Sequence, residues 1–319
     1  IVFGDWSSDV CSSDLSSKGI AVNSNGALCV FTNEITGRNN DPVPLIVRKS
    51  DGGYGYDATD LAAIRHRIVD CGATRLIYVV GSPQSQHFAM IFAAAKKAGW
   101  LKDSVRAEHV SFGNILGADG KPFKTRSGES VKLLDVLTEA VERALALVRE
   151  KSAHIPEAEQ REVAEAVGIG AVKYADLSND RIKDYVFAWD RMLSFDGNTA
   201  PYLQNAYVRI QSIFRKAEEQ GLDTKGSLAD FSQPEERLLA LELLKAPDYV
   251  QQVARSLEPH RLCGYLYGLA SLFHSFYEKC TVLGAAEADR KRRFLLARCT
   301  ADMIRLCAGL LGIDVIERM

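Results

Sequence analysis

Short apolar runs alternate with helix-type patterns through the first third of the chain. The runs are rich in Val, Ile, Leu and Phe, are separated by turns such as 37–42, and lie at 27–32, 45–47 and 75–80. Apolar residues recur at helical spacing in between, at 57–70 and 86–98. A strand, helix, strand order indicates parallel βαβ crossovers. We therefore expect an α/β sheet whose ligands bind at the carboxyl ends of its strands.

The pattern becomes almost wholly helical from about residue 131. Apolar residues in 132–151 recur at intervals of three and four, which predicts an amphipathic helix. Farther along, 232–235 (Ser-Gln-Pro-Glu) is typical of a capping box and predicts a helix over 237–244. The second half of the chain is therefore expected to be an all-α bundle.

Composition narrows the class of protein only a little. The chain has 319 residues, of which 47% are hydrophobic and 25% charged, and this is typical of two globular domains. The net charge of -2 does not indicate nucleic acid, and no apolar run approaches the roughly 20 residues that a transmembrane helix needs. The seven cysteines show no metal-type pairing with one another or with His, which favours free thiols in a reducing cytoplasm. We predict neither a metal site nor a membrane role.

The N-terminal stretch 5–15 repeats Ser-Ser-Asp and lacks apolar periodicity. It has neither the basic start nor the apolar centre of a signal peptide. It resembles the translated read-through of a sequencing adapter. We therefore expect residues 1–15 to be foreign and Ser16 to be the first natural residue.

A glycine-bounded cationic loop, 117–128, follows the predicted strand 107–112. Lys121, Lys124 and Arg126 place three positive charges within six residues. Fixed cations beside a close backbone suit an oligophosphate that gains negative charge during reaction. A solvated basic turn is the equally weighted alternative.

Other phosphate-binding motifs are incomplete. The cationic loop is not a Walker loop, because Ile115 and Pro122 stand where that motif needs Gly and Ser or Thr. The glycine runs 52–55 and 168–170 do not complete G-x-G-x-x-G, since Lys173 takes the third glycine position of the second run. We expect both runs to be ordinary turns.

Tyr56 and Asp60 stand four residues apart where a helix should begin, so they share a face. A carboxylate beside a phenol hydroxyl is a plausible grip for a guanidinium. The alternative is that Asp60 only stabilises the helix N-terminus and Tyr56 packs in the core. Gln84 follows the end of a predicted strand, and His87, just beyond it, is more often a structural residue than a catalyst.

Aromatic and basic residues gather at two places in the helical half. Stacking rings and phosphate-binding arginines are what single-stranded RNA loops require, although an aromatic core and a solvated charged face are the equally common alternative. The residues concerned are Tyr202, Tyr207 and Arg209, and Arg290, Lys291, Arg292, Arg293, Arg298 and Arg305.

Taken in order, four stretches resemble arginyl-tRNA synthetase, a class I aminoacyl-tRNA ligase: 51–62, 117–128, 167–177 and 192–204. The likeness extends from about Lys18 to the last residue. It implies an α/β, Rossmann-like part of the class I catalytic domain over 16–194. Residues 195–319 are similar to the all-α anticodon-binding domain of this family, called DALR.

The resemblance also implies roles for individual residues. Tyr56, Asp60 and Gln84 would bind L-arginine, with Asp60 opposite the guanidinium. The loop would be the divergent counterpart of the KMSKS signature, with Lys121, Lys124 and Arg126 catalytic and Thr125 joining them in ATP binding. Candidates for contact with tRNA(Arg) are Tyr202, Arg209, Arg293 and Met319.

ATP with Mg²⁺ would be a substrate, with no tightly bound cofactor, and a monomer is expected. The family also uses an earlier HIGH signature, and none of the six histidines begins a His-x-Gly-His sequence. We therefore expect an N-terminally truncated chain that does not form arginyl-adenylate by itself. The alternatives are a class I synthetase of another specificity, a non-catalytic tRNA-binding fragment, and a protein-interaction bundle.

Overall fold

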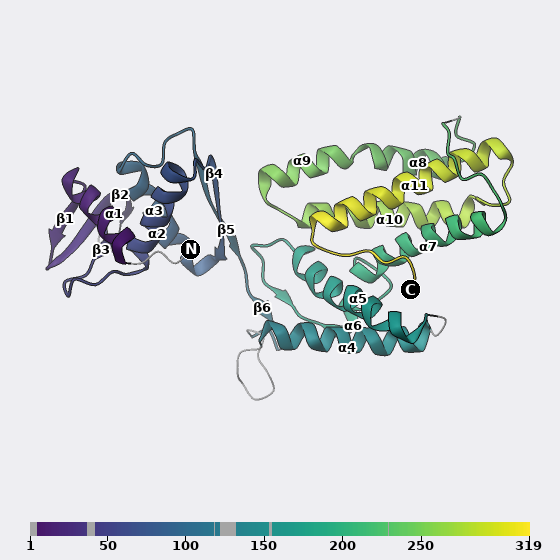
Figure 1. Ribbon diagram of the computed structural model, residues 1–319, viewed down its shortest axis with the longest axis horizontal. Helices are drawn as coiled ribbons and strands as arrows, with labels where there is room; N and C mark the ends of the chain where they lie inside the picture. The colour runs from purple at the N-terminus through teal and green to yellow at the C-terminus, as the bar shows by residue number, and fades with distance from the viewer. Residues whose placement is uncertain (1–4, 37–41, 118, 122–131, 153–154, 229) are drawn as a thin grey trace. The chain divides into compact units, whose positions relative to one another are not determined.

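The computed structural model describes all residues except 1–4, 37–41, 118, 122–131, 153–154 and 229 (Figure 1). The chain forms two compact units, Ile1–Gly113 and Asn114–Met319. This division reflects how the residues pack, and it falls earlier in the chain than the domain boundary at 194/195 that the motifs predict. That boundary stays a prediction.

The first unit begins with helix α1 (Asp5–Ser17) and an antiparallel sheet of strands β1 (Ala21–Ser24), β2 (Ala27–Thr36) and β3 (Pro42–Arg48). Asn25 and Gly26 join β1 to β2 with φ angles of 49° and 81°. Two successive left-handed residues form the tight turn that Asn-Gly favours in hairpins. The expectation that every strand of this region is parallel was therefore wrong for β2 and β3.

A parallel βαβ unit follows, as predicted. Strand β4 (Arg75–Gly81) pairs in parallel with β5 (Arg106–Phe112), and helix α3 (Ser85–Lys97) connects them. Helix α2 (Tyr56–Arg65) precedes this unit and continues into a π-helical turn, His66–Asp70. The predicted helices 57–70 and 86–98 are thus confirmed to within a residue or two.

The core of the first unit lies between its helices and sheets. Leu61, Ile64 and Ile91 are fully buried from α2 and α3. On β4, the ring of Tyr78 packs 4.9 Å from that of Phe88 on α3, while Ile77 and Val79 on the opposite face are exposed. Alternation along the strand therefore puts one face of β4 against α3 and leaves the other in solvent.

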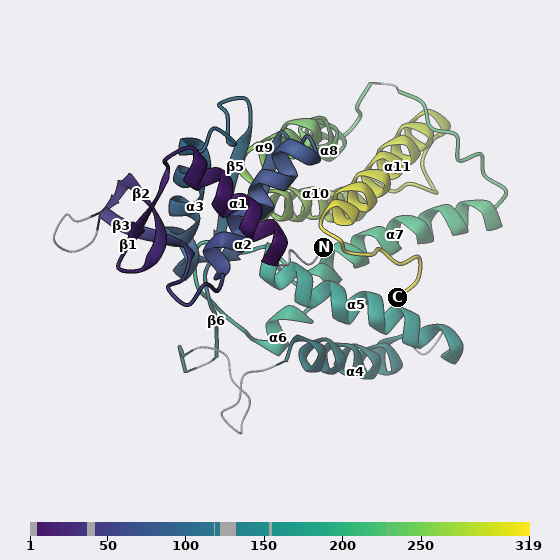
Figure 2. The ribbon, with the colours of Figure 1, turned by 60° about the vertical axis from the view of Figure 1, so that its left-hand side comes forward.

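The second unit contains a short parallel pair, β6 (Ile115–Leu116) and β7 (Tyr185–Val186), and two long helices. The helices α4 (Leu133–Lys151) and α5 (Glu157–Leu177) lie side by side in both views (Figures 1 and 2). Gly168 of α5 faces Ala140 of α4 so closely that an added Cβ would meet backbone atoms at 2.7 Å. The glycine run 168–170 is therefore not a turn, as we had expected, but a close helix crossing.

After the single helical turn α6 (Trp189–Met192), the rest of the second unit is a helical bundle. Its helices are α7 (Ala200–Glu219), α8 (Pro234–Leu244), α9 (Ala246–Ser256), α10 (His260–Lys279) and α11 (Glu287–Leu310). Helix α10 packs against the other four, and Leu266, Phe273 and Phe276 from it are fully buried. The expected all-α bundle is confirmed.

The predicted capping box exists, one residue later than expected. Helix α8 begins at Pro234, with Gln233 as its N-cap. The carboxylate of Glu236 accepts hydrogen bonds from the backbone N–H of Gln233 at 3.2 Å and of Ser232 at 2.9 Å. Within the described parts of the chain, no helix combines the length and the apolar character that crossing a membrane requires.

Replacing Gly168 by Ala should destabilise the second unit by about 2–3 kcal/mol, because the methyl group would overlap the Ala140 backbone, which cannot move aside. Urea unfolding followed by circular dichroism at 222 nm measures this. The control is Gly264→Ala in α10, where nothing lies within 4 Å of the added Cβ. That change should stabilise by about 0.5–1 kcal/mol through helix propensity. Equal effects of the two changes would contradict the close crossing.

Candidate functional site

An imidazole lies between two carboxylates where α2 and α3 meet. The Nε2 atom of His87, in the first turn of α3, lies 2.7 Å from Oδ2 of Asp60 on α2. Its Nδ1 atom lies 3.2 Å from Oδ1 of Asp57, one turn earlier on α2. The other Asp57 oxygen accepts the backbone N–H of Ile46 at 3.2 Å. A chain of polar contacts thus runs from β3 through Asp57 and His87 to Asp60.

Two further predicted arginine ligands lie at the start of α2 and in the turn just before α3. Tyr56 is the first residue of α2 and is 87% exposed, so the alternative that it packs in the core was wrong. Gln84 ends the 3₁₀ turn Ser82–Gln84, which follows directly on the carboxyl end of β4, and it is exposed three residues before His87. The Asp60 side chain remains 34% exposed despite its bond to His87. A phenol, a carboxylate and a carboxamide are therefore open to a ligand on these elements.

Only the first part of the cationic loop lies within the described residues. After β6 the chain turns at Gly117, whose N–H donates to the Lys121 carbonyl at 2.8 Å and whose carbonyl accepts from Gly120 at 3.0 Å. Gly120 has a φ of 72°, which only glycine adopts readily. This turn leaves Lys121 exposed. Lys124, Thr125 and Arg126 lie outside the described residues.

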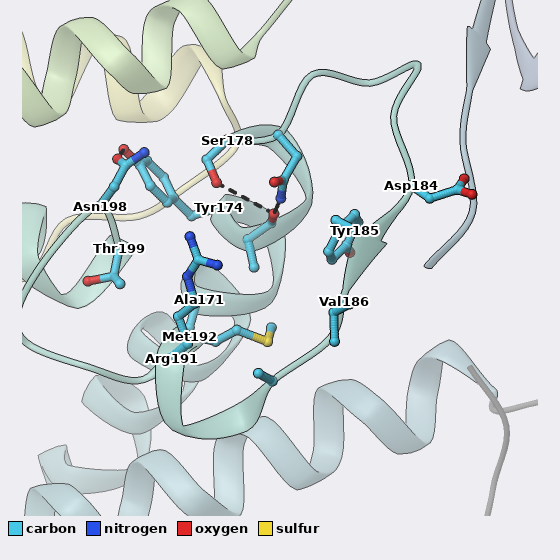
Figure 3. Close-up of a pocket in the computed structure, with 13 residues that line it drawn as sticks. Ala171, Tyr174, Ser178, Asp184, Tyr185, Val186, Arg191, Met192, Asn198 and Thr199 are labelled. Atoms are coloured by element: carbon cyan, nitrogen blue, oxygen red, sulfur yellow. Dashed lines mark hydrogen bonds between the residues drawn. The ribbon is translucent and has the colours of Figure 1, made fainter. Parts of the chain in front are cut away.

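A polar pocket of about 350 Å³ lies within the second unit, between the end of α5, strand β7 and the start of α7 (Figure 3). Figure 3 shows the Arg191 guanidinium pointing into it. Thr199 on its wall caps α7 by accepting the Tyr202 N–H at 3.3 Å. The Tyr174 hydroxyl lies 2.6 Å from Oδ1 of Asn198 and 2.9 Å from the Cys263 carbonyl, and burial raises the pKa of this phenol. Met192, Asn198 and Thr199 of the predicted motif 192–204 line this pocket, together with residues of α5 and β7.

Aromatic rings gather on one side of α7 and α10. The ring of Tyr202 lies 5.5 Å from that of Tyr267 and 4.8 Å from that of His274. Arg209 donates a hydrogen bond to Nδ1 of His274 at 3.3 Å, and its guanidinium lies 5.7 Å from the centre of the Tyr277 ring. Burial, helped by the Arg209 charge, lowers the pKa of His274 to about 4, so this imidazole is neutral at pH 7 and can accept that bond. We call these five residues the α7–α10 aromatic face.

Sequence reasoning found only Tyr202 and Arg209 of this face. The residues it missed, Tyr267, His274 and Tyr277, recur at helical spacing along α10 and offer a signal that could have revealed them. Tyr207, by contrast, is buried in the bundle core at 4% exposure, as the core alternative expected. Helical periodicity therefore places Tyr202 and Tyr207 on different faces of α7, the first at the aromatic face and the second in the core.

Two arginines of the basic stretch of α11, Arg292 and Arg293, belong to an internal ion network. Arg293 is only 7% exposed, and its Nε donates to Oε1 of Glu236 at 2.6 Å. Arg292 donates to the same carboxylate at 3.1 Å from Nε and from Nη2. Our expectation that Arg293 contacts RNA is therefore withdrawn, because its guanidinium already neutralises a buried carboxylate. Met319, another candidate, is partly buried against the α4–α5 core.

The segment that we expect to be adapter-derived forms most of α1. Leu15 and Cys11 are buried in the first unit, and Trp100 donates its indole N–H to Asp14 at 3.0 Å. The buried face of α1 also includes Ser8 and Ser12, so it is only partly apolar. Packing does not test the origin of the segment, which stays a prediction. Among the described residues, no three His, Cys, Asp or Glu side chains gather as metal ligands.

Comparison with known protein families assigns both parts of the chain. Residues 7–189, more than half of the chain, match the model for "tRNA synthetases class I (R), catalytic domain". Residues 203–319 match the "DALR anticodon binding domain". The order of the two matches agrees with the predicted fold class, a class I catalytic fold followed by a helical domain.

Individual proteins agree with these families. The chain is 53% identical to an arginine–tRNA ligase of Frankia casuarinae over 96% of the chain and 52% of that protein. It is 49% identical to one from Laribacter hongkongensis, again over 96% of the chain and 53% of that protein. The chain thus spans about half the length of the curated relatives it matches.

Solved structures give the same result. The arginyl-tRNA synthetase of Thermus thermophilus superposes with a TM-score of 0.84 at 26% identity, over 98% of the chain and 58% of that structure. The enzyme from Plasmodium falciparum gives 0.80 at 32% identity, over 98% and 52% respectively.

Replacing Glu236 by Gln should destabilise the bundle by about 3–5 kcal/mol, because buried Arg293 would lose its acidic partner and buried Arg292 would keep only the partly exposed Asp289. Burial alone would raise the pKa of Glu236, but the hydrogen bonds from the two arginines outweigh it and lower this pKa to about 2 from 4.5. The carboxylate therefore stabilises the fold fully above pH 4.5, and this stabilisation is lost as the pH falls towards 2.

Urea unfolding of the bundle between pH 7 and pH 3 measures both effects. Glu235→Gln is the matched control, since Glu235 pairs with Lys279, which is 62% exposed. It should cost far less than Glu236→Gln, because solvent screens the Glu235–Lys279 pair. A Glu236→Gln protein as stable as this control would show that the buried network does not stabilise the bundle.

Proposed function

We propose an activity for this chain from its family, because the chain belongs to the class I arginyl-tRNA synthetases. The proposed activity is that of an arginine–tRNA ligase, which activates L-arginine with ATP and transfers it to tRNA(Arg). The observation that carries the proposal within the structure is the accessible carboxylate of Asp60, held beside exposed Tyr56 at the start of α2. Mg²⁺ accompanies ATP in this proposal, and the protein acts as a monomer in the cytoplasm.

Arginine recognition rests on Tyr56, Asp60 and Gln84. A guanidinium is planar, always charged and rich in N–H donors, so a carboxylate is its natural partner. Asp60 accepts from this group, while the hydroxyl of Tyr56 and the amide of Gln84 are available for the polar remainder of the amino acid. A class I enzyme for a neutral amino acid would have no use for the Asp60 charge, and this disfavours the alternative of another specificity.

The first chemical step places negative charge on the phosphates. The arginine carboxylate attacks the α-phosphorus of ATP, the bond to the bridging oxygen breaks, and pyrophosphate leaves. Positioning and charge stabilisation dominate such phosphoryl chemistry. The cations of the loop supply this stabilisation in our proposal: exposed Lys121, and Lys124 and Arg126 outside the described residues. Thr125, also outside them, joins these cations in binding ATP. In the second step a terminal hydroxyl of the tRNA takes the arginyl group and releases AMP.

We propose that the α7–α10 aromatic face binds the anticodon loop. Tyr267 and Tyr277 are 37% and 40% exposed, so each can offer a ring to an unstacked base. Exposed Arg209 supplies a positive charge beside them, and neutral His274 holds that charge in place through its hydrogen bond. The match of residues 203–319 to an anticodon-binding family supports this assignment. Met319 stays a secondary candidate.

Asp60→Asn should weaken the binding of L-arginine by about 100-fold, because the guanidinium loses its charged acceptor. Isothermal titration calorimetry with the 319-residue chain measures the affinity. Asp103→Asn, an exposed aspartate elsewhere in the first unit, is the matched control and should bind as the unmodified chain does. Unchanged arginine affinity in the Asp60→Asn protein would remove Asp60 from the site and the arginine specificity with it.

Tyr277→Ala should weaken binding of tRNA(Arg) by about 5- to 100-fold, the range expected for losing one base-stacking ring. Gel shifts with the whole chain at several salt concentrations measure this, because phosphate contacts give a steep salt dependence. Phe231→Ala is the matched control, since Phe231 is equally exposed at 42% but lies outside the aromatic face. Equal affinities for the two variants would refute the aromatic face as the RNA site.

A further inference from the structure

We propose that His87 is a positioning residue that aims the Asp60 carboxylate at the arginine guanidinium, an inference that rests on the proposed function. His87 is not itself a ligand in this proposal. It holds one oxygen of Asp60 and leaves the rest of the carboxylate to the substrate. Asp57 in turn orients the imidazole.

The geometry gives each ring nitrogen a separate partner. Nε2 faces Asp60 at 2.7 Å and Nδ1 faces Asp57 at 3.2 Å. Ionised carboxylates only accept hydrogen bonds, so Nε2 of His87 donates to Asp60 at the shorter of the two distances, while Asp57 faces Nδ1 on the other side of the ring. The imidazole side chain is 20% exposed and packs edge-on against Phe88 at 5.3 Å between ring centres, so it has little room to rotate.

The Asp57 carboxylate, which orients the His87 ring, is itself held in place by the backbone of β3. Its second oxygen accepts the Ile46 N–H, which belongs to the backbone of β3 and cannot rotate away. The line from Ile46 to Asp60 therefore crosses three elements, β3, α2 and α3. An isolated aspartate on a helix rotates among several rotamers, whereas this one is held by a chain of contacts that ends on a strand.

The alternative for the same contact is that His87 blocks Asp60 and must leave before arginine binds. Two observations favour positioning. A carboxylate accepts about four hydrogen bonds, and His87 uses one of them, on Oδ2. The Asp60 side chain also remains 34% exposed with His87 in place, so a guanidinium can still reach it. The two alternatives predict opposite changes in affinity when the imidazole is removed.

The two ring nitrogens can be tested separately, because amide side chains of different length replace one of them at a time. His87→Gln keeps an N–H donor near the position of Nε2, towards Asp60, whereas His87→Asn keeps one near Nδ1, towards Asp57. His87→Ala keeps neither. We expect calorimetry with L-arginine to show a loss of about tenfold for the Ala and Asn variants and less than about threefold for Gln.

A second readout does not depend on arginine. The side-chain carboxyl carbon of Asp60, observed by ¹³C NMR in the ligand-free chain, should shift in the Ala and Asn variants and stay near its original position in the Gln variant. Thermal unfolding of each variant identifies any general loss of structure, and a merely structural role of His87 would make affinity follow stability rather than the position of the amide.

Each outcome decides one of the two proposals. Equal arginine affinities in the Gln and Asn variants, together with an unmoved Asp60 resonance in all three, overturn the positioning role. Tighter arginine binding by His87→Ala also overturns it and favours the blocking alternative. If Asp60→Asn leaves arginine binding unchanged, or if the unmodified chain binds no arginine, the proposed function fails. The NMR comparison then still shows whether His87 holds Asp60.

Discussion

Burying a charged side chain is costly unless an opposite charge pairs with it. This constraint divides the charged residues of the chain into buried ones that stabilise the fold and exposed ones that are open to ligands. Glu236, fully buried, is matched by two arginines and by backbone N–H groups. Arg209 and Lys121, both exposed, have no comparable buried partner among the described residues. A basic residue is therefore available to an anionic ligand only where its charge is not already paired within the fold.

The two units meet this constraint with different architectures. In the first unit, a parallel crossover brings the end of β4 and the first turn of α3 to the same place, and the pairing of β4 with β5 fixes it residue by residue from Arg75 to Gly81. Polar side chains there are supported from neighbouring elements, as Asp60 is by His87. In the second unit, the bundle buries its polar contacts between helices. Gln204 of α7, for example, donates to the carbonyls of Ala166 and Asp314.

Much of this organisation could be predicted from sequence, because local pattern determines it. The helices after residue 131, the parallel crossover and the glycine-bounded turn at Gly117 all follow from periodicity and turn chemistry. Strand β1 was missed although Asn25-Gly26 is a strong hairpin signal, since we did not pair the residues on its two sides. The candidate arginine ligands came from a motif, and motifs carry no information on what supports their side chains.

What could not be predicted depends on contacts between residues far apart in the chain. Arg293 looked like a surface cation within a basic run, and only the approach of Glu236 from α8, 57 residues away, makes it an internal one. Gly168 looked like part of a turn, and only the backbone of α4 shows why no side chain fits there. His87 looked like a solitary histidine because its two partners lie on the preceding helix.

The support for Asp60 also bears on selectivity. An ammonium is a compact charge with rotatable donors, so a carboxylate that rotates freely can pair with it from many directions. A guanidinium is planar with donors in a fixed fork, so it pairs best with a carboxylate held in one orientation. In the role that we propose for His87, holding Asp60 by one oxygen favours a planar cation over a compact one without adding any contact to the ligand. The same contact leaves the Asp60 side chain about one third exposed, so its charge can still be reached from solvent.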